Sequence, residues 1–385
     1  MSVEAASGRF GESAWMRHPL PARPVDRAAA LVQGGQARGE PARLRPLHLN
    51  ESPYPPSPKA VAAMAASAAG VNRYPDPNAR LLCAELSARS GIPASRIACA
   101  NGSEELIQVL CTLGAGPGDE VVVPAPAFPG IAISATLRNA VVARVPLDAR
   151  GANDAQALLA AITARTRVVF SCSPHPPSGG MMEAAALQQL IQGVPDNVLL
   201  VMDEAYHEFG RHAGGPDILA ALAGRRGPWV NLRTFSKAYG LAGARVGYAF
   251  CSSDEIADAV RRVKTTYGPS AMSLAGALAA LQDDAYLATV LDAVARERDR
   301  MTAGLRALGL QPFASLANFV SVALPMPGAQ AMQGLHARGI LVRDWRDPDY
   351  QKEIRITVGL AEDTDAVLQA IKEILAEAPA AGTGI

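Results

Sequence analysis

The chain has 385 residues, 49% of them hydrophobic and 19% charged, which is enough for two to three domains with a sizeable core. Lys plus Arg (36) equals Asp plus Glu (36), so the sequence lacks the basic excess of a protein that binds nucleic acid or an anionic membrane. No apolar run approaches the roughly 18 residues of a membrane span, and residues 1–16 hold no apolar signal-peptide core, so we expect a cytoplasmic protein that acts on small molecules.

Residues 1–45 are rich in Ala, Arg, Pro and Gly without a sustained period, which predicts a partly disordered N-terminal arm. Beyond it, short β-branched runs alternate with helix-length stretches. This alternation predicts an α/β fold with a mostly parallel sheet sandwiched by helices. The runs lie at 121–123, 168–170, 198–202, 230–232 and 246–250. Because polar residues follow each run, we expect the chemistry at the carboxyl edge of this sheet.

A long helical pattern at 286–308 leads into a C-terminal part where strands and helices mix, which indicates a second, smaller α/β domain. The predicted strands lie at 318–322, 340–343 and 354–358, and the predicted helices at 329–338 and 363–376. The expected division is an arm (1–45), an N-terminal segment joining the small domain (46–75), a large cofactor-binding domain (76–300) and a small C-terminal domain (301–385).

The five cysteines and six histidines show no metal-ligand spacing, so we expect reduced thiols and no metal site.

The segment 234–248 places a lysine, a serine and an arginine between two apolar strands. The amine of Lys237 can form a Schiff base if burial or a nearby cation lowers its pKa, while Ser236 and Arg245 suit a phosphate. Together they predict a covalently held, phosphorylated aldehyde. For Lys237 taken alone, the alternative is an exposed loop lysine.

Asp203 follows the apolar run at 198–202, where a carboxylate either caps the next turn or serves chemistry. Beside Lys237, it would keep a pyridine nitrogen protonated and so make the ring an electron sink. Tyr206, three residues on, would then hydrogen-bond the phenolic oxygen of the ring.

Two further features indicate anions. Gly102 permits a close backbone approach and Ser103 is a good N-cap, which fits either an anion site or an ordinary capped helix. Arg355 interrupts an apolar strand and needs an anionic partner, either a substrate carboxylate or a structural Asp or Glu.

With these features in this order, the chain resembles the fold-type I aminotransferases (class I/II) that depend on pyridoxal 5′-phosphate, and among them the histidinol-phosphate aminotransferases. The resemblance covers residues 46–377. The supporting strings lie at 49–54, 73–76, 101–105, 203–206, 233–248, 317–319 and 355–359.

The resemblance implies roles for the matching positions. Lys237 would hold the cofactor as a Schiff base and shuttle a proton, with Asp203 on the pyridinium nitrogen and Tyr206 on the phenolic oxygen. The remaining cofactor contacts would be Phe128 stacked on the ring and, around the phosphate, Ser103, the Glu104 backbone, Ser236, Arg245 and Tyr74 from a second subunit. A homodimer with shared active sites follows from the role of Tyr74.

For the substrate, the resemblance implies that Arg355 binds the α-carboxylate and that Asn50 lies nearby. Tyr54, Arg343 and Arg233 are either contacts to a distal anion or structural residues.

One segment departs from the family pattern. The usual Asn-Pro-Asn-Asn-Pro-Thr-Gly is Ser-Pro-His-Pro-Pro-Ser-Gly at 173–179, so the asparagine that would donate to the phenolic oxygen is Pro176, which has no donor. Either His175 replaces it as a donor or the histidine only fills space.

The predicted function is transfer of an amino group between an amino acid or amino alcohol phosphate and a 2-oxo acid, with histidinol phosphate of histidine biosynthesis as the leading donor. The departure at 173–179 leaves open a decarboxylase, lyase, cyclase or oxidase with the same cofactor. A cofactor-binding regulator or pseudoenzyme is the third alternative.

Overall fold

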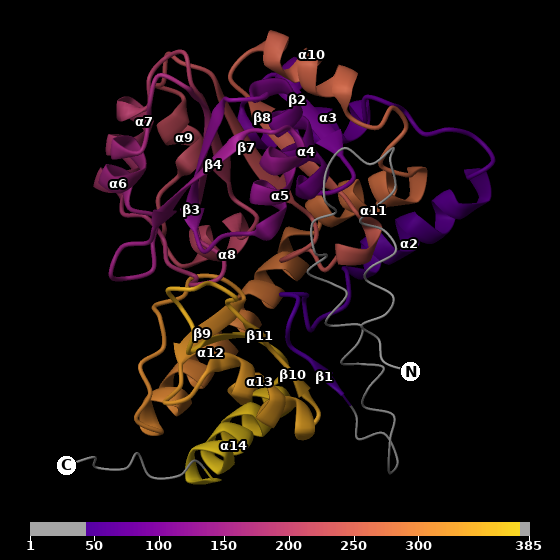
Figure 1. Ribbon diagram of the computed structural model, residues 1–385. Coiled ribbons are helices and arrows are strands. Elements are labelled where there is room, and N and C mark those ends of the chain that lie inside the picture. The colour runs from indigo at the N-terminus through magenta and orange to yellow at the C-terminus, as the bar shows by residue number, and fades with distance from the viewer. Residues whose placement is uncertain (1–43, 378–385) are drawn as a thin grey trace, which may run out of the picture.

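The computed structural model describes residues 44–377, so the predicted arm lies outside the described residues apart from its last two positions. Figure 1 shows two bodies, a larger one that contains the seven-stranded sheet and a smaller one formed mainly by the C-terminal part of the chain. The predicted division at residues 76 and 300 stays a prediction.

The sheet of the larger body has the strand order β2-β8-β7-β6-β5-β3-β4. Strand β8 runs antiparallel to β7 and β2, whereas the pairs from β7 across to β4 are parallel. The predicted fold class is therefore confirmed. The strands are β2 (Ile97–Ala100), β3 (Glu120–Ala125), β4 (Val141–Pro146), β5 (Thr166–Cys172), β6 (Leu199–Asp203), β7 (Trp229–Thr234) and β8 (Gly247–Cys251).

Side chains of the central strands alternate between two apolar layers. In β5, Val169 packs into one core cluster while Val168 and Phe170 pack into the other, as the two-residue period of a strand requires. Helices cover both faces, which explains why these strands are continuous apolar runs. The helices are α2 (Pro58–Ser67), α3 (Arg80–Ser90), α4 (Ser103–Gly114), α5 (Pro129–Leu137), α6 (Ala155–Ala160), α7 (Ala184–Gly193), α8 (His207–His212), α9 (Ile218–Leu222), α10 (Asp254–Val263) and α11 (Ala271–Leu281), with short 3-10 turns at η2 (Ala68–Gly70), η3 (Ala94–Arg96) and η4 (Ala242–Ala244).

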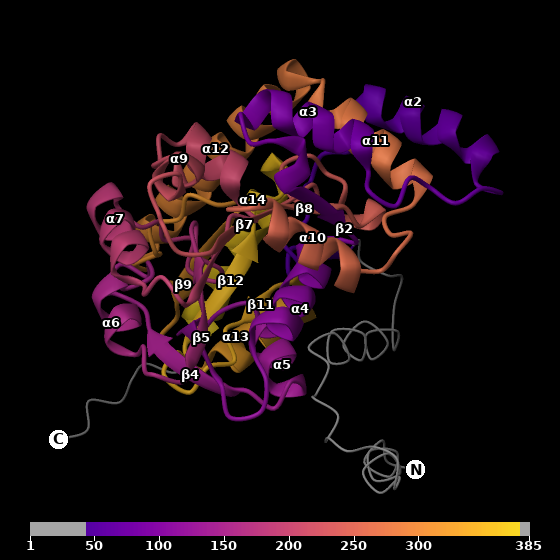
Figure 2. The ribbon, with the colours of Figure 1, turned by 90° about the horizontal axis from the view of Figure 1, so that it is seen from above.

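The smaller body contains an antiparallel sheet of order β11-β12-β9 and a two-stranded parallel pair, β1 with β10. The long helix α12 connects the bodies, and α2 and α11 extend together to one side of the molecule (Figures 1 and 2). The elements are β1 (Arg45–Pro46), α12 (Asp284–Ala307), β9 (Phe319–Ala323), α13 (Gly328–Ala337), β10 (Ile340–Leu341), β11 (Arg343–Asp344), β12 (Glu353–Thr357) and α14 (Ala361–Glu377).

One predicted strand is wrong in detail. Residues 340–343 form not one strand but the whole of β10 and the first residue of β11, because the chain changes partner at Val342, from β1 to β12. The five cysteines are free and buried, and within residues 44–377 no helix has the length and apolar composition that crossing a membrane requires.

The N-terminal segment 45–50 ties the smaller body to the larger one. Arg45 forms an ion pair with Asp363 at the start of α14, and the carbonyl of Leu47 accepts the N–H of Thr357 in β12. Two residues later the same segment reaches the carboxyl edge of the large sheet.

Candidate active site

The predicted lysine, aspartate and tyrosine lie together at the carboxyl edge of the sheet. Asp203 ends β6 and Lys237 follows the end of β7 by three residues; because β6 and β7 are parallel neighbours, both side chains emerge at one edge. The Nζ of Lys237 lies 5.9 Å from the centre of the Tyr206 ring and donates to the carbonyl of Leu49 at 3.0 Å.

The protein shifts both charged groups toward their neutral forms. Burial and, to a lesser extent, the nearby Arg355 guanidinium lower the pKa of Lys237 to about 7. Burial raises the pKa of Asp203 to about 6, against a hydrogen bond from the Ala205 N–H at 3.0 Å. An uncharged amine is the nucleophile that an aldehyde needs, and a buried carboxyl is stabilised by a cation placed next to it.

Tyr206 is held by the N-terminal segment. Asn50 donates from Nδ2 to the Tyr206 hydroxyl at 2.8 Å, and its Oδ1 accepts the Thr357 hydroxyl at 3.1 Å. Asn318 in turn donates to the Asn50 carbonyl at 3.1 Å. The structure therefore places Asn50 behind Tyr206, where its side-chain oxygen and nitrogen are already engaged.

An anion cradle forms where β2 turns into α4. A Cβ on Gly102 would stand 2.5 Å from the Nη2 of Arg245, so the glycine lets this guanidinium lie against the start of the helix. Arg245 also donates to the Ser236 hydroxyl at 3.4 Å. Gly247 likewise has no room for a Cβ beside the backbone N–H of Ser103.

The expected N-cap is wrong by one residue. Gly102 caps α4 without a side-chain bond, and Ser103 is the first helical residue. The Ser103 hydroxyl therefore caps none of the free N–H groups in the first turn of α4. The Glu104 side chain is exposed, so Glu104 contributes to the cradle through its backbone N–H. Free helical N–H groups beside a guanidinium and a hydroxyl suit a phosphate.

Phe128 and His175 lie on two loops that touch. Phe128 precedes α5 with 37% of its surface exposed, while His175 is fully buried. Both ring nitrogens of His175 are engaged, Nε2 with the Pro126 carbonyl at 2.7 Å and Nδ1 with the Asn153 side chain at 2.8 Å. The interpretation of His175 as a replacement donor to the cofactor is therefore wrong, because the ring has no donor left.

Arg355 is a cation of the site without an acidic partner among the described residues. It donates from Nη2 to the carbonyl of His48 at 2.7 Å, while its buried Nε has no hydrogen-bond partner. Arg343 stands directly opposite it across the β11–β12 pair, and burial together with Arg343 lowers the pKa of Arg355 to about 10. No structural Asp or Glu forms an ion pair with Arg355 among residues 44–377.

Arg233 and Tyr54, the other two residues considered for contact with a distal anion, have different surroundings. Arg233 is buried and paired with Glu204, with Nη2 and Oε2 at 2.9 Å, so it is structural. Tyr54 packs partly buried against the core of the smaller body.

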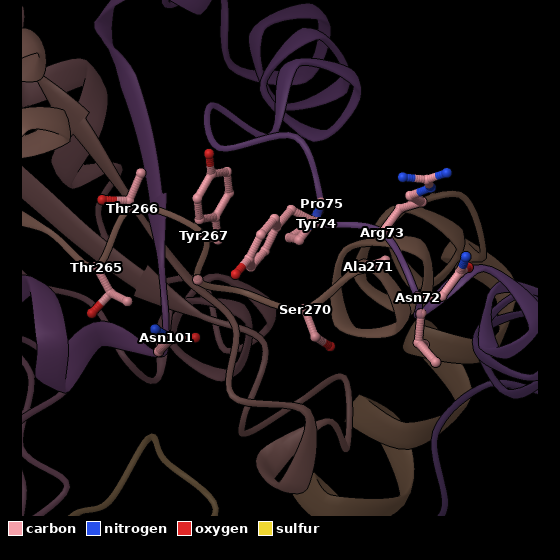
Figure 3. A pocket seen from close by; sticks show the side chains of 12 residues that line it. Asn72, Arg73, Tyr74, Pro75, Asn101, Thr265, Thr266, Tyr267, Ser270 and Ala271 are labelled. Atoms are coloured by element: carbon pink, nitrogen blue, oxygen red, sulfur yellow. The ribbon is translucent and has the colours of Figure 1, made fainter.

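Tyr74 lines an open pocket of about 850 Å³, shown in Figure 3, and Lys237 does not line this pocket. Its side chain is 80% exposed and stacks on Tyr267, with ring centres 4.2 Å apart. The pocket is joined to the anion cradle by Glu105, which accepts the N–H groups of Asn101 at 2.6 Å and Thr265 at 2.7 Å.

Sequence reasoning missed Asn153, and it gave Asn318 no role although the supporting string 317–319 contains it. Asn318 directly precedes β9 and is fully buried, which a polar residue next to an apolar strand could have signalled. Asn153 lies in a loop before a short helix, and the sequence carries no signal for it.

The assembled groups fit pyridoxal 5′-phosphate. The cradle suits its phosphate, the uncharged Lys237 amine its aldehyde, Asp203 its ring nitrogen and Tyr206 its phenolic oxygen. The unpartnered Nε of Arg355 leaves an anion-binding group for a substrate.

Comparison with known proteins gives consistent results. Residues 45–371 match the family described as aminotransferase class I and II. The chain is 34% identical to histidinol-phosphate aminotransferase 1 of Mesorhizobium japonicum (88% of this chain, 92% of that protein). It is 38% identical to an aromatic amino acid aminotransferase of Streptomyces coelicolor (86% and 90%). The crystal structure of histidinol-phosphate aminotransferase from Sinorhizobium meliloti with pyridoxal 5′-phosphate superimposes with a TM-score of 0.85 at 28% identity, covering 96% of this chain and 99% of that one.

Proposed function

The chain belongs to the class I and II aminotransferases and is a pyridoxal-phosphate-dependent transaminase, and we propose that its amino donor is histidinol phosphate and its acceptor a 2-oxo acid. The observation that carries the choice of donor is the pair of guanidiniums, Arg343 and Arg355, opposite each other in register. The relatives named for histidinol phosphate support it further.

Opposed residues of an antiparallel pair project on the same face within about 5.5 Å, and like charges there are destabilising. Asp344, the neighbouring carboxylate, is engaged by Arg346 at 3.0 Å. Two cations held together in this way suit a ligand group with two negative charges. A phosphate monoester has about that charge near neutral pH, whereas an α-carboxylate has one.

In the proposed reaction, bound pyridoxal phosphate supplies the electron sink for the bond electrons of the substrate's α-carbon. Its phosphate would be held by Ser236, Arg245 and the N–H groups at Ser103 and Glu104. Asp203 would keep a proton on its ring nitrogen.

Phe128 would cover the ring, and Tyr206 would donate to the phenolic oxygen. Lys237, with a pKa of about 7, takes the α-proton as a free amine and returns it later.

The donor can be tested by following the cofactor absorbance in the absence of 2-oxo acid. Histidinol phosphate should convert the cofactor at least 100-fold more efficiently than histidinol, which lacks only the phosphate. Arg343→Met should reduce this preference while leaving the reaction with alanine, whose only anionic group is its α-carboxylate, nearly unchanged. A faster reaction with phenylalanine would instead support aromatic amino acid donors, as in the Streptomyces relative.

We also propose a homodimer with shared active sites. The exposed Tyr74 and Tyr267 pair supports it, as do the exposed Val61, Val71 and Leu81 of the segment from α2 to α3. Mixing Lys237→Ala with Tyr74→Ala protein under exchange conditions should restore activity, because a hybrid dimer has one site with both native residues. Failure to restore any activity in a verified hybrid would refute sharing.

A further inference from the structure

His175 lies at the centre of a buried polar chain that joins three segments. Asn153 accepts the Cys172 N–H at 2.7 Å and the Ser171 hydroxyl at 2.8 Å, both at the end of β5. The Asn153 amide also hydrogen-bonds His175, and His175 in turn hydrogen-bonds the Pro126 carbonyl. Asn153 and His175 are 2% and 0% exposed, so water does not substitute for these bonds.

The hydrogen bonds determine the protonation of the ring. The Asn153 atom that accepts a backbone N–H must be oxygen, so its nitrogen donates to Nδ1 of His175. A carbonyl only accepts, so Nε2 carries the proton given to Pro126. Burial lowers the pKa of His175 to about 4, which agrees with a neutral ring.

This series of hydrogen bonds ends at the Pro126 carbonyl, two residues before Phe128. The Phe128 ring packs directly against Gly130, where a Cβ would overlap it. The end of β5 pairs with Asp203, since Cys172 and Asp203 are register partners. The polar chain thus spans from the strand beside Asp203 to the segment that carries Phe128.

We propose that His175 is a positioning residue that, as a neutral ring, fixes the Pro126 carbonyl and thereby the Phe128 ring over the cofactor. The proposal rests on the place given above to Phe128, and it does not depend on which amino donor the enzyme uses. The loop that lacks the family's asparagine therefore contributes to the cofactor site by a different route, through the backbone before α5.

The test measures the dissociation constant of pyridoxal phosphate by titrating the cofactor-free protein. His175→Phe keeps a planar ring but breaks both hydrogen bonds, and it should raise this constant about tenfold. His175→Gln has an oxygen for Asn153 and an amide N–H for Pro126, so it should stay within about threefold of the wild type. Ser178→Ala is the matched control, because Ser178 is equally buried in the same loop and bonds to Gly151 and His175 carbonyls instead.

A double-mutant cycle with Phe128→Ala separates positioning from a general structural role. If His175 acts through Phe128, His175→Phe adds little to Phe128→Ala; full additivity refutes the proposal. An unchanged constant in Phe128→Ala refutes the place of Phe128 itself, and with it this role.

Histidine ¹⁵N NMR of the wild type gives an independent readout that needs no variant to fold. We expect a protonated Nε2, an unprotonated Nδ1 and no titration between pH 5.5 and 9. A ring that titrates near pH 6.5 would overturn the proposal.

Discussion

Arg355 carries a buried charge that the free protein only partly stabilises, so its replacement should affect stability and binding in opposite directions. We consider Arg355→Met, which keeps an unbranched chain of similar volume and removes the charge. The ring of Phe319, 5.5 Å from the guanidinium carbon, would remain as an apolar neighbour.

The expected gain in stability follows from the pKa. The fall of the Arg355 pKa from its ordinary value to about 10 corresponds to about 3 kcal/mol of unfavourable free energy for the charged form in the folded protein. Because the pKa in the folded protein is the lower one, this cost is present in full below pH 10 and disappears only as the pH rises toward the ordinary pKa of an arginine. Loss of the bond to the His48 carbonyl offsets about 1.5 kcal/mol. The net gain of about 1–2 kcal/mol should raise Tm by a few degrees.

Substrate binding should suffer at the same time. Removing one partner of a buried charge pair costs about 2–5 kcal/mol, which is roughly a 30- to 5000-fold loss in affinity. Thermal unfolding of the substrate-free enzyme and the KM for the 2-oxo acid measure the two effects.

Arg355→Lys is the control, since it keeps a charge and should not gain stability. A variant that loses stability and keeps its KM would show that Arg355 is a structural residue.

Three other experiments test the cofactor groups. The rate at which pyridoxal phosphate attaches to the cofactor-free protein should increase with pH and be half-maximal near pH 7, the pKa of Lys237. This midpoint should move upward in Arg355→Met, and a midpoint near pH 10 in the wild type would contradict the burial of the amine. Asp203→Asn should retain the cofactor but lose most turnover, since a neutral amide cannot hold the ring nitrogen protonated, and near-normal kcat would exclude this role. Gly102→Ala should weaken cofactor binding at least tenfold in a titration, because its φ of 82° and the adjacent Arg245 both exclude a Cβ, whereas Gly243→Ala, which has open space, should not.

The main elements were predictable because their signals are local. Buried strands appear as short apolar runs, so β3 and β5 to β8 were found within one or two residues of their ends. Lys237 and Asp203 were recognisable because each follows such a run at the sheet edge. The supporting contacts were not predictable: Asn50 and Tyr206 are 156 positions apart, and Asn153 and His175 are 22 positions apart across a loop. No periodicity marks such pairs, and the absence of a donor at Pro176 suggested a direct role for His175 that its two hydrogen bonds exclude.

The N-terminal segment 45–50 sets a limit on how the chain can be shortened or fused. Its few residues supply a strand to the smaller body, the carbonyl that accepts the Lys237 amine and the amide that holds Tyr206. A fusion partner joined ahead of Arg45 leaves every one of these bonds in place. A chain that begins after Asn50 would keep the entire large sheet, yet its reactive lysine would lose the acceptor that orients it. The smallest catalytic form of this enzyme therefore begins outside the sheet that carries its chemistry.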